Sequence, residues 1–483
     1  MKKTILRCFL ILFALLLPVS ALAGIGFLTP PQYDKTFLGA LSPKVERLYS
    51  IEEPKVIIIG GSSVAFGYDT KLMEKHLGMP VVNFGLYASL GTKVMLDMAK
   101  DAIRKGDIVV LAPEMDAQTL SLYFNGEALW QAADSDFSLL AKVHSDNRNA
   151  MIGNFWGYTA GKFHYLRTGA PDPEGVYRAD SFDEYGDLIY SRPQNEMALA
   201  YDPTTIISLT PSILDAEFAT YLNEYIGDAE KKGATVYFTF SPMNELAMAG
   251  DTTDQSLLDF YAYLTRTLDC EIISSLKDCI MEAGYFYDSN FHLNDSGVIV
   301  RTATLIKDIR RAQGITTPVN IILPEAPALP ERPEDEDKID PNDAEASKDA
   351  DCFTYEVREA DGKLIVTGVT EAGKSRTELT VPAYYEGQEV VAIGEYAFRD
   401  CTKLETLIVQ KNVTAFYNKA FAGCDSLKKV RLNTEGKDPT VNPDGLMEET
   451  SSALRFSIAS EYYANFVTQY NWIPYKSFVV AED

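Results

Sequence analysis

A buried-strand pattern that ends in a glycine–serine turn is the first feature that could do chemistry. Residues 57–67 read Ile-Ile-Ile-Gly-Gly-Ser-Ser-Val-Ala-Phe-Gly, and a helical pattern begins at Thr70. In an open α/β sheet ligands collect at the carboxyl ends of the strands, where a helix N-terminus offers backbone N–H groups to a developing oxyanion. A hydroxyl of this turn could therefore act as a nucleophile, although glycine and serine are also ordinary turn residues.

The second feature is His292, one of four histidines in the chain. Near neutral pH an imidazole accepts the proton of a serine hydroxyl, and a carboxylate on its other nitrogen fixes its tautomer. Asp288 is the nearest upstream carboxylate. The other histidines fit structural positions better, because His76 ends a predicted helix and His144 and His164 lie in an irregular stretch.

The elements that must position these residues follow an alternating pattern. From residue 55 onward, short β-rich runs alternate with amphipathic helical stretches, and the apolar strands indicate burial on both faces. Gly78, Gly106 and Gly233 stand where helices should end. The pattern predicts an α/β domain with a doubly wound parallel sheet in three layers. We expect strands at 56–59, 81–84, 108–111, 236–240 and 271–274, and helices at 70–77, 91–105, 213–232, 255–268 and 296–313.

These features together resemble the SGNH, or GDSL-like, hydrolase family, particularly its exported branch of esterases and acyltransferases that act on bacterial surface polysaccharides. The resemblance spans about residues 55–313. The family's first block, Gly-Asp-Ser, is matched by Gly61-Ser62-Ser63, which implies that Ser63 is the nucleophile. Its last block is matched by Asp288 and His292, which the resemblance implies are the acid and the base.

The resemblance also implies where an oxyanion would be bound. The glycine of the second block is matched by Gly85, which could equally serve only a tight turn. The third block usually supplies an asparagine, but the corresponding strand end carries Glu114, a carboxylate that would oppose oxyanion charge if ionised. We therefore expect another donor, Asn83 or Asn244, or weak hydrolysis. Two milder departures are Ser62, in place of an aspartate, and an acid that precedes the base by one residue more than usual.

The first 24 residues have the pattern of a secretory signal. A basic start is followed by an apolar run from Cys8 to Leu17 and by small residues before Gly24. The run is shorter than the roughly 20 residues of a membrane span, but Pro18–Phe27 is also rather apolar, so a cleaved signal and an uncleaved anchor both remain open. We expect the chain after about Pro30 to be secreted or held at the cell surface, without a later membrane span.

The α/β domain is expected at 30–322, with an insertion at about 124–211 that is rich in aromatic residues, Asn, Asp and Pro. The aromatic residues of the insertion could line a pocket, although a satellite core is favoured. From 323 to 351 the composition changes to Pro, Glu, Asp and Ala, which predicts an extended acidic linker before a second domain at 352–483. The aromatic residues concerned are Phe155, Trp156, Tyr158, Phe163 and Tyr165.

A repeat with an offset of 23 residues follows the linker: 397–404 reads Ala-Phe-Arg-Asp-Cys-Thr-Lys-Leu, and 420–427 reads Ala-Phe-Ala-Gly-Cys-Asp-Ser-Leu. It resembles the BspA-like leucine-rich repeats of bacterial surface antigens over about residues 353–432. The repeat predicts a short solenoid of stacked coils. Cys401 and Cys424 are then stacked core thiols rather than a disulfide. The apolar positions that repeat in register are Ile393 with Phe416, Leu407 with Val430, and Val409 with Leu432.

The composition of the chain limits which classes of partner and cofactor we expect. A net charge of −25 argues against nucleic acid as a partner. No cysteines have zinc-ligand spacing, and a covalent serine route needs neither a metal nor an organic cofactor. Cys270 and Cys279 could form a disulfide or be two small buried residues.

Two functions remain open from the sequence. The first is an exported serine esterase or O-acyltransferase that acts on acylated glycans or small esters, with repeats that contact a protein or cell-wall ligand. A membrane would be contacted only through an uncleaved N-terminal segment. The alternative is a non-catalytic surface interaction protein whose hydrolase scaffold is degenerate.

Overall fold

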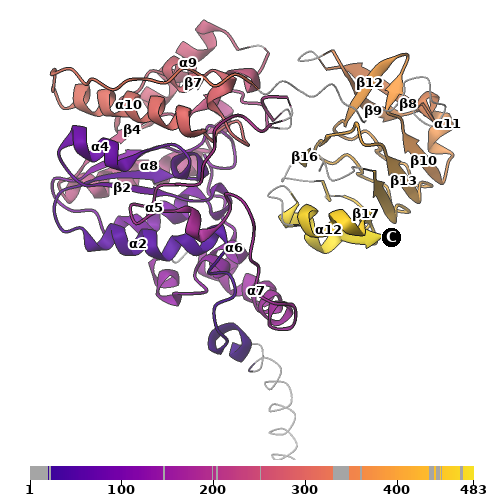
Figure 1. The fold of residues 1–483 in the computed structure, drawn as a ribbon, viewed down its shortest axis with the longest axis horizontal. Helices are drawn as coiled ribbons and strands as arrows, with labels where there is room; N and C mark the ends of the chain where they lie inside the picture. The colour runs from indigo at the N-terminus through magenta and orange to yellow at the C-terminus, as the bar shows by residue number, and fades with distance from the viewer. Residues whose placement is uncertain are drawn as a thin grey trace, which may run out of the picture. The chain divides into compact units, whose positions relative to one another are not determined.

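The computed structural model shows two compact units (Figure 1). Within the described ranges no helix combines the length and the apolar character needed to cross a bilayer. Most of the predicted signal and the central part of the predicted linker lie outside the described residues. The described residues are 20, 23–144, 147–197, 199–202, 205–250, 252–329, 347–358, 362–433, 440–441, 446–447, 449–467 and 472–482. The first unit comprises 1–201 and 206–330, and the second comprises 202–205 and 331–483.

A five-stranded parallel sheet forms the centre of the first unit. Its order is β2-β1-β3-β4-β6, and every neighbouring pair is parallel. The predicted α/β class with a parallel sheet is therefore confirmed. The strands are β1 (Val56–Gly60), β2 (Val81–Gly85), β3 (Ile108–Leu111), β4 (Thr235–Phe238) and β6 (Glu271–Ile272). A short parallel pair, β5 (Met243–Asn244) and β7 (Ile280–Met281), lies outside this sheet.

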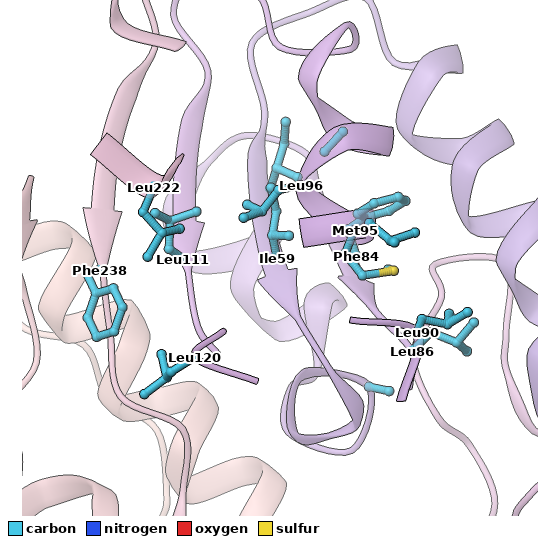
Figure 2. Close-up of a cluster of buried hydrophobic side chains, with 14 of the residues drawn as sticks. Ile59, Phe84, Leu86, Leu90, Met95, Leu96, Leu111, Leu120, Leu222 and Phe238 are labelled. Atoms are coloured by element: carbon cyan, nitrogen blue, oxygen red, sulfur yellow. The ribbon is translucent and has the colours of Figure 1, made fainter. Parts of the chain in front are cut away.

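Helices cover both faces of the sheet because alternate strand residues point to opposite sides. Ile57 and Ile59 belong to a large core cluster, while Val56 and Ile58 belong to a second cluster. Figure 2 shows part of the first cluster, with strand residues packed against helices. That cluster includes residues of α2 (Leu41–Ser50), α5 (Thr92–Lys100), α8 (Ala216–Lys231) and α9 (Asp254–Thr267), and the second includes α4 (Thr70–Leu77) and α10 (Asp295–Ala312).

Local signals fix the ends of α4, which spans the predicted residues. The side chain of Asp69 accepts the N–H of Leu72, and Gly78 ends the helix in the left-handed region at φ 71°. The helix predicted at 91–105 is shorter, because α5 ends at Lys100. The Asp107 carboxylate accepts the N–H of Arg104 and so organises the turn before β3.

The insertion contains a long helix that its sequence pattern does not predict. The 21-residue α7 (Arg148–Thr168) carries apolar residues on both sides, so it lacks the periodicity of an amphipathic helix. Phe155 and Tyr158 pack with Tyr33 and Trp130 in a separate cluster, as a satellite core requires. Trp156 and Phe163 are instead exposed. The insertion also contains α6 (Gly126–Ala132).

The second unit is a short solenoid with two mainly parallel sheets. The predicted register is found, since Leu407 pairs with Val430 and Phe416 with Ile393 across parallel strands. One sheet has the order β10-β13-β15-β17-β18 and the other includes the order β16-β14-β12-β9-β8. The elements are β8 (Phe353–Val357), β9 (Leu364–Val369), α11 (Glu371–Lys374), β10 (Glu378–Val381), β11 (Tyr384–Tyr385), β12 (Gln388–Ile393), β13 (Thr406–Val409), β14 (Ala415–Phe416), β15 (Lys429–Leu432), β16 (Thr440–Val441), β17 (Arg455–Ala459), α12 (Ser460–Phe466) and β18 (Val479–Glu482).

Stacked side chains fill the solenoid. The rings of Phe398 and Phe421 lie 5.7 Å apart, and the Cys424 thiol contacts the carbonyl of Phe398 at 3.0 Å. Cys401 and Cys424 are buried free thiols, as predicted. At the N-terminal end β8 and β9 pair antiparallel and cap the array. In the first unit Cys270 and Cys279 are free as well.

Candidate catalytic site at the end of the first strand

The chain turns sharply at the end of β1 and enters the short helix α3 (Ser62–Ala65). A side chain at Gly60 would collide with the carbonyl of Ala112, so the turn requires a glycine there. The turn places Ser63 at the carboxyl end of β1, beside β3, where the strand order reverses and ligands bind in such sheets. Ser63 is only 1% exposed, and its hydroxyl has no hydrogen-bond partner. An unpaired buried hydroxyl is costly, which favours a functional reason for it.

His292 and Asp288, the predicted base and acid, are hydrogen-bonded to each other. His292 Nδ1 lies 2.7 Å from Asp288 Oδ1, and the other carboxylate oxygen accepts the hydroxyl of Tyr177 at 2.6 Å. A carboxylate accepts hydrogen bonds, so it assigns the proton of the neutral imidazole to Nδ1 and leaves Nε2 as an acceptor. Tyr177 comes from the insertion, and its role could not be predicted from spacing.

The imidazole also packs on the helix that carries Ser63. The rings of His292 and Phe66 are stacked, with centroids 4.1 Å apart and planes 9° from parallel. Phe66 ends α3 and lies about one turn after Ser63. The base is thus held against the helix of the nucleophile, while no hydrogen bond joins the Ser63 hydroxyl to it. Catalytic hydrogen bonds are often long in ligand-free enzymes and shorten when substrate binds.

Glu114 accepts a hydrogen bond from the backbone N–H of Ser63, which is the donor that an oxyanion would need. Its Oε1 accepts the backbone N–H of Ser63 at 2.7 Å and the hydroxyl of Ser62 at 2.9 Å. A carboxylate is stabilised at a helix N-terminus, so Glu114 caps α3 from the end of β3. While this hydrogen bond persists, the Ser63 N–H is not available to a substrate.

Asn83 and Gly85 use their donors within the protein. The Asn83 amide donates to the carbonyl of Val64 at 3.0 Å and to the carboxylate of Asp187 at 3.2 Å. Its carbonyl oxygen accepts the N–H of Gly85 at 3.3 Å. A side chain at Gly85 would collide with Val64, so this glycine permits α3 to pack closely on β2. Both residues shape the turn that carries Ser63.

Asn244 has a similar structural role. Its amide donates to the carbonyl of Ala200 at 2.8 Å, and its carbonyl oxygen accepts the N–H of Leu246 at 3.0 Å as a helix cap. The side chain is fully buried. Both predicted asparagines therefore use their amides in bonds that hold the fold, Asn83 through two bonds and Asn244 through one.

Arg192, also from the insertion, brings an unpaired cationic donor to the site. Its side chain is 3% exposed, and Nη1 has no hydrogen-bond partner. The guanidinium carbon lies 5.2 Å from the centroid of the Phe66 ring, on which His292 stacks. Burial lowers the pKa of Arg192, while the charge of Asp295 opposes that effect. No motif in the sequence points to this residue.

A second carboxylate near Glu114 titrates unusually. Burial, with a contribution from the charge of Glu114, raises the pKa of Asp116 from 3.8 to about 7. The Thr119 hydroxyl lies 2.6 Å from the carbonyl of Glu114, to which it donates, and 2.9 Å from Asp116 Oδ2. Because one hydroxyl has one proton, a protonated Asp116 can donate to Thr119 in return.

We expect Asp116→Asn to stabilise the protein at pH 8 and to have little effect at pH 4. A folded-state pKa above the unfolded value means that the native state binds the proton more tightly, so stability falls as pH rises from about 4 to about 7. The amide supplies the donor at every pH and removes this dependence. Urea unfolding at both pH values measures the effect. Asp101→Asn, at an exposed position, is the control, and an equal gain there would contradict the assignment.

Comparisons with known proteins identify the repeat region. The family described as BspA type leucine rich repeat region, six copies, matches residues 376–439. A leucine-rich repeat protein of known structure from Bacteroides ovatus ATCC 8483 is 22% identical over 23% of this chain and 26% of its own, with a TM-score of 0.15. No curated protein matches the chain. Residues 376–439 are thus a BspA-type leucine-rich repeat region, which confirms the predicted repeats, while the likeness of the first unit to SGNH hydrolases stays a prediction.

Proposed function

We propose that the first unit is a serine-dependent esterase or O-acyltransferase in which Ser63 is the nucleophile, His292 the base and Asp288 the acid. The observation that carries the proposal is the unpartnered, buried hydroxyl of Ser63 on the helix against which the His292–Asp288 pair packs. The three residue types supply a complete set for acyl transfer.

In the first half-reaction, Ser63 Oγ attacks the carbonyl carbon of an ester and its proton moves to His292 Nε2. Asp288 stabilises the imidazolium through Nδ1. Collapse of the tetrahedral intermediate breaks the bond to the leaving alcohol, which takes the proton from Nε2, and the acyl group remains on Ser63. Water or a sugar hydroxyl then gives its proton to His292 and attacks the acyl-enzyme. The bond between the acyl group and Ser63 Oγ breaks, and Oγ takes the proton back from Nε2.

Negative charge on the intermediate needs a donor. The Ser63 N–H can serve only after Glu114 releases it, so the arrangement with Glu114 on Ser63 is a resting state. The unpaired Nη1 of Arg192 needs no such change and supplies positive charge beside Phe66. Rearrangement of Glu114 on substrate binding would couple catalysis to occupancy of the site.

Acyl groups on cell-surface or extracellular glycans are the proposed substrates. The resemblance to exported polysaccharide-modifying enzymes and the signal-like N-terminus support this class. The leucine-rich repeat region supports surface attachment, because solenoids offer extended binding surfaces. In this proposal the repeats hold the enzyme to a protein or cell-wall ligand while the first unit modifies the glycan.

Covalent labelling tests the proposal. A fluorophosphonate probe should label the wild-type chain, and Ser63→Ala should abolish both the label and the hydrolysis of a chromogenic acetyl ester. Ser241→Ala is a matched control, since Ser241 is also buried and its hydroxyl also has no partner. It should keep the label. Absence of label in the wild type and in Glu114→Gln, which weakens the cap on Ser63, would reject catalysis.

One observation favours a second function. Glu114 accepts the Ser63 N–H, and Asn83 and Asn244 use their amides in bonds within the protein, which favours an inactive scaffold. The chain would then be a surface interaction protein whose repeats bind a partner. This function is supported if the probe labels neither the wild-type chain nor Glu114→Gln and the chain binds saturably to a cell surface.

A further inference from the structure

The outer side of α7 is an exposed apolar surface. Ile152, Trp156, Phe163 and Leu166 are 66%, 45%, 49% and 47% exposed, and we call these four residues the α7 outer face. They follow one stripe along the helix, next to the stripe of Phe155 and Tyr158 that faces the satellite core. A water-soluble surface rarely places four large apolar residues along one helix without a partner.

The charge of α7 is also unusual for this chain. The protein has 69 acidic residues, but none lies between Arg148 and Thr168. Lys162 is buried against Asp134, but Arg167 is exposed, and its guanidinium carbon lies 5.9 Å from the centroid of the Phe163 ring, at the edge of the α7 outer face. An apolar and aromatic stripe that has a cation at its edge and no acidic residue along its helix fits a helix at the surface of an anionic bilayer.

The N-terminal segment is attached to the same helix. The carbonyl of Gly26 accepts the hydroxyl of Tyr158 at 3.1 Å and the ammonium of Lys162 at 3.4 Å. The ring of Phe27 stacks on Phe155 at 5.1 Å, and the exposed Leu28 follows it. In Figure 1 the start of the described chain lies next to α7.

The residues that precede Gly26 in the sequence limit how far the α7 outer face can lie from a membrane that holds the N-terminal apolar run. The apolar run of residues 8–17 ends nine residues before Gly26, and nine residues span at most about 30 Å. If this run is inserted in a membrane, α7 cannot lie far from the lipid surface. Both the reach of the chain and the composition of the helix therefore favour the bilayer as the occupant of this face.

We propose that the α7 outer face rests on an anionic membrane, with Trp156 and Phe163 inserted at the level of the headgroups. The first unit is then held at the membrane by two elements, the N-terminal apolar run and α7. This inference does not depend on the proposed catalysis, because it uses neither Ser63 nor His292.

Tryptophan fluorescence tests the proposal in the full chain. The protein has three tryptophans, and Trp130 and Trp472 are buried, so the emission lost in Trp156→Phe reports on Trp156. The chain is synthesised in the presence of phosphatidylglycerol vesicles whose acyl chains carry bromine, a contact quencher. We expect most of the Trp156 emission to be lost in these vesicles and to be kept in vesicles without bromine.

A matched control places the reporter elsewhere on the same unit. Leu258 on α9 is 60% exposed, and Figure 1 shows α9 and α7 at opposite ends of the unit. Leu258→Trp in the Trp156→Phe background should stay unquenched. Equal quenching at both positions would overturn the proposal. The proposal would also be overturned if brominated lipid did not quench the Trp156 emission. If that unquenched emission were shielded from iodide as well, residues 8–17 or a second copy of the chain would cover the face instead of the membrane.

Discussion

Replacing Asp288 with asparagine should lower ester turnover by about 10⁴-fold without unfolding the protein. The carboxylate accepts a hydrogen bond from Nδ1–H of His292 at 2.7 Å and so leaves Nε2 able to take the proton of Ser63. An asparagine amide can donate to Nδ1, which stabilises the opposite tautomer, with the proton on Nε2. The measurement is kcat for a chromogenic acetyl ester, with circular dichroism as the check on folding.

Tyr177→Phe is the matched control for that variant. It removes the hydroxyl that donates to Asp288 at 2.6 Å but keeps the carboxylate and therefore the tautomer of His292. A hydrogen bond to a charged group contributes about 1.5–3 kcal/mol, so we expect a loss on the order of tenfold to a hundredfold. If both variants lost activity equally, the role of Asp288 as the tautomer-setting acid would be contradicted.

Replacing Lys55 with methionine should destabilise the first unit by about 3–5 kcal/mol. The side chains of Lys55 and Asp107 are both fully buried, with Nζ and Oδ2 3.0 Å apart, just before β1 and β3. Removing the ammonium leaves a buried carboxylate without its counter-charge. Urea unfolding followed by circular dichroism measures the change.

The control is the double variant Lys55→Met with Asp107→Asn. The asparagine oxygen can still accept the backbone N–H of residue 55, which Asp107 accepts at 3.1 Å, and no charge remains buried. We expect the double variant to recover much of the lost stability. A double variant that recovers none of the stability lost in Lys55→Met would show that the cost comes from lost packing of the lysine stem instead.

Features with local signals could be predicted from the sequence. The limits of α4 match the prediction because an aspartate cap and a glycine stop encode them directly, at Asp69 and Gly78. The 23-residue repeat also predicts its own pairing, since each coil stacks on a copy of itself, as Leu407 does on Val430. In both cases the information lies within a short stretch of chain.

The surroundings of the candidate site could not be predicted in this way. Tyr177 lies 111 residues from Asp288, and Arg192 has no motif, so only the folded chain shows that they meet the acid and Phe66. The position of Glu114 at a strand end predicts that it opposes oxyanion charge, but its bond to the Ser63 N–H depends on the approach of β3 to α3. The helix α7 could not be predicted either, because a helix with apolar residues on both sides has no clear hydrophobic periodicity in its sequence.

The hydrogen bonds that hold the carbonyl of Gly26 have a mechanical consequence. Because Tyr158 and Lys162 bind the chain at this point, Gly26 is a fixed attachment point on the folded unit for the residues upstream. A flexible stalk would let the unit swivel and sample a wide volume. The nine residues from the apolar run to Gly26 instead keep Gly26 within about 30 Å of any surface that holds residues 8–17, so only molecules near that surface would come within reach of the first unit.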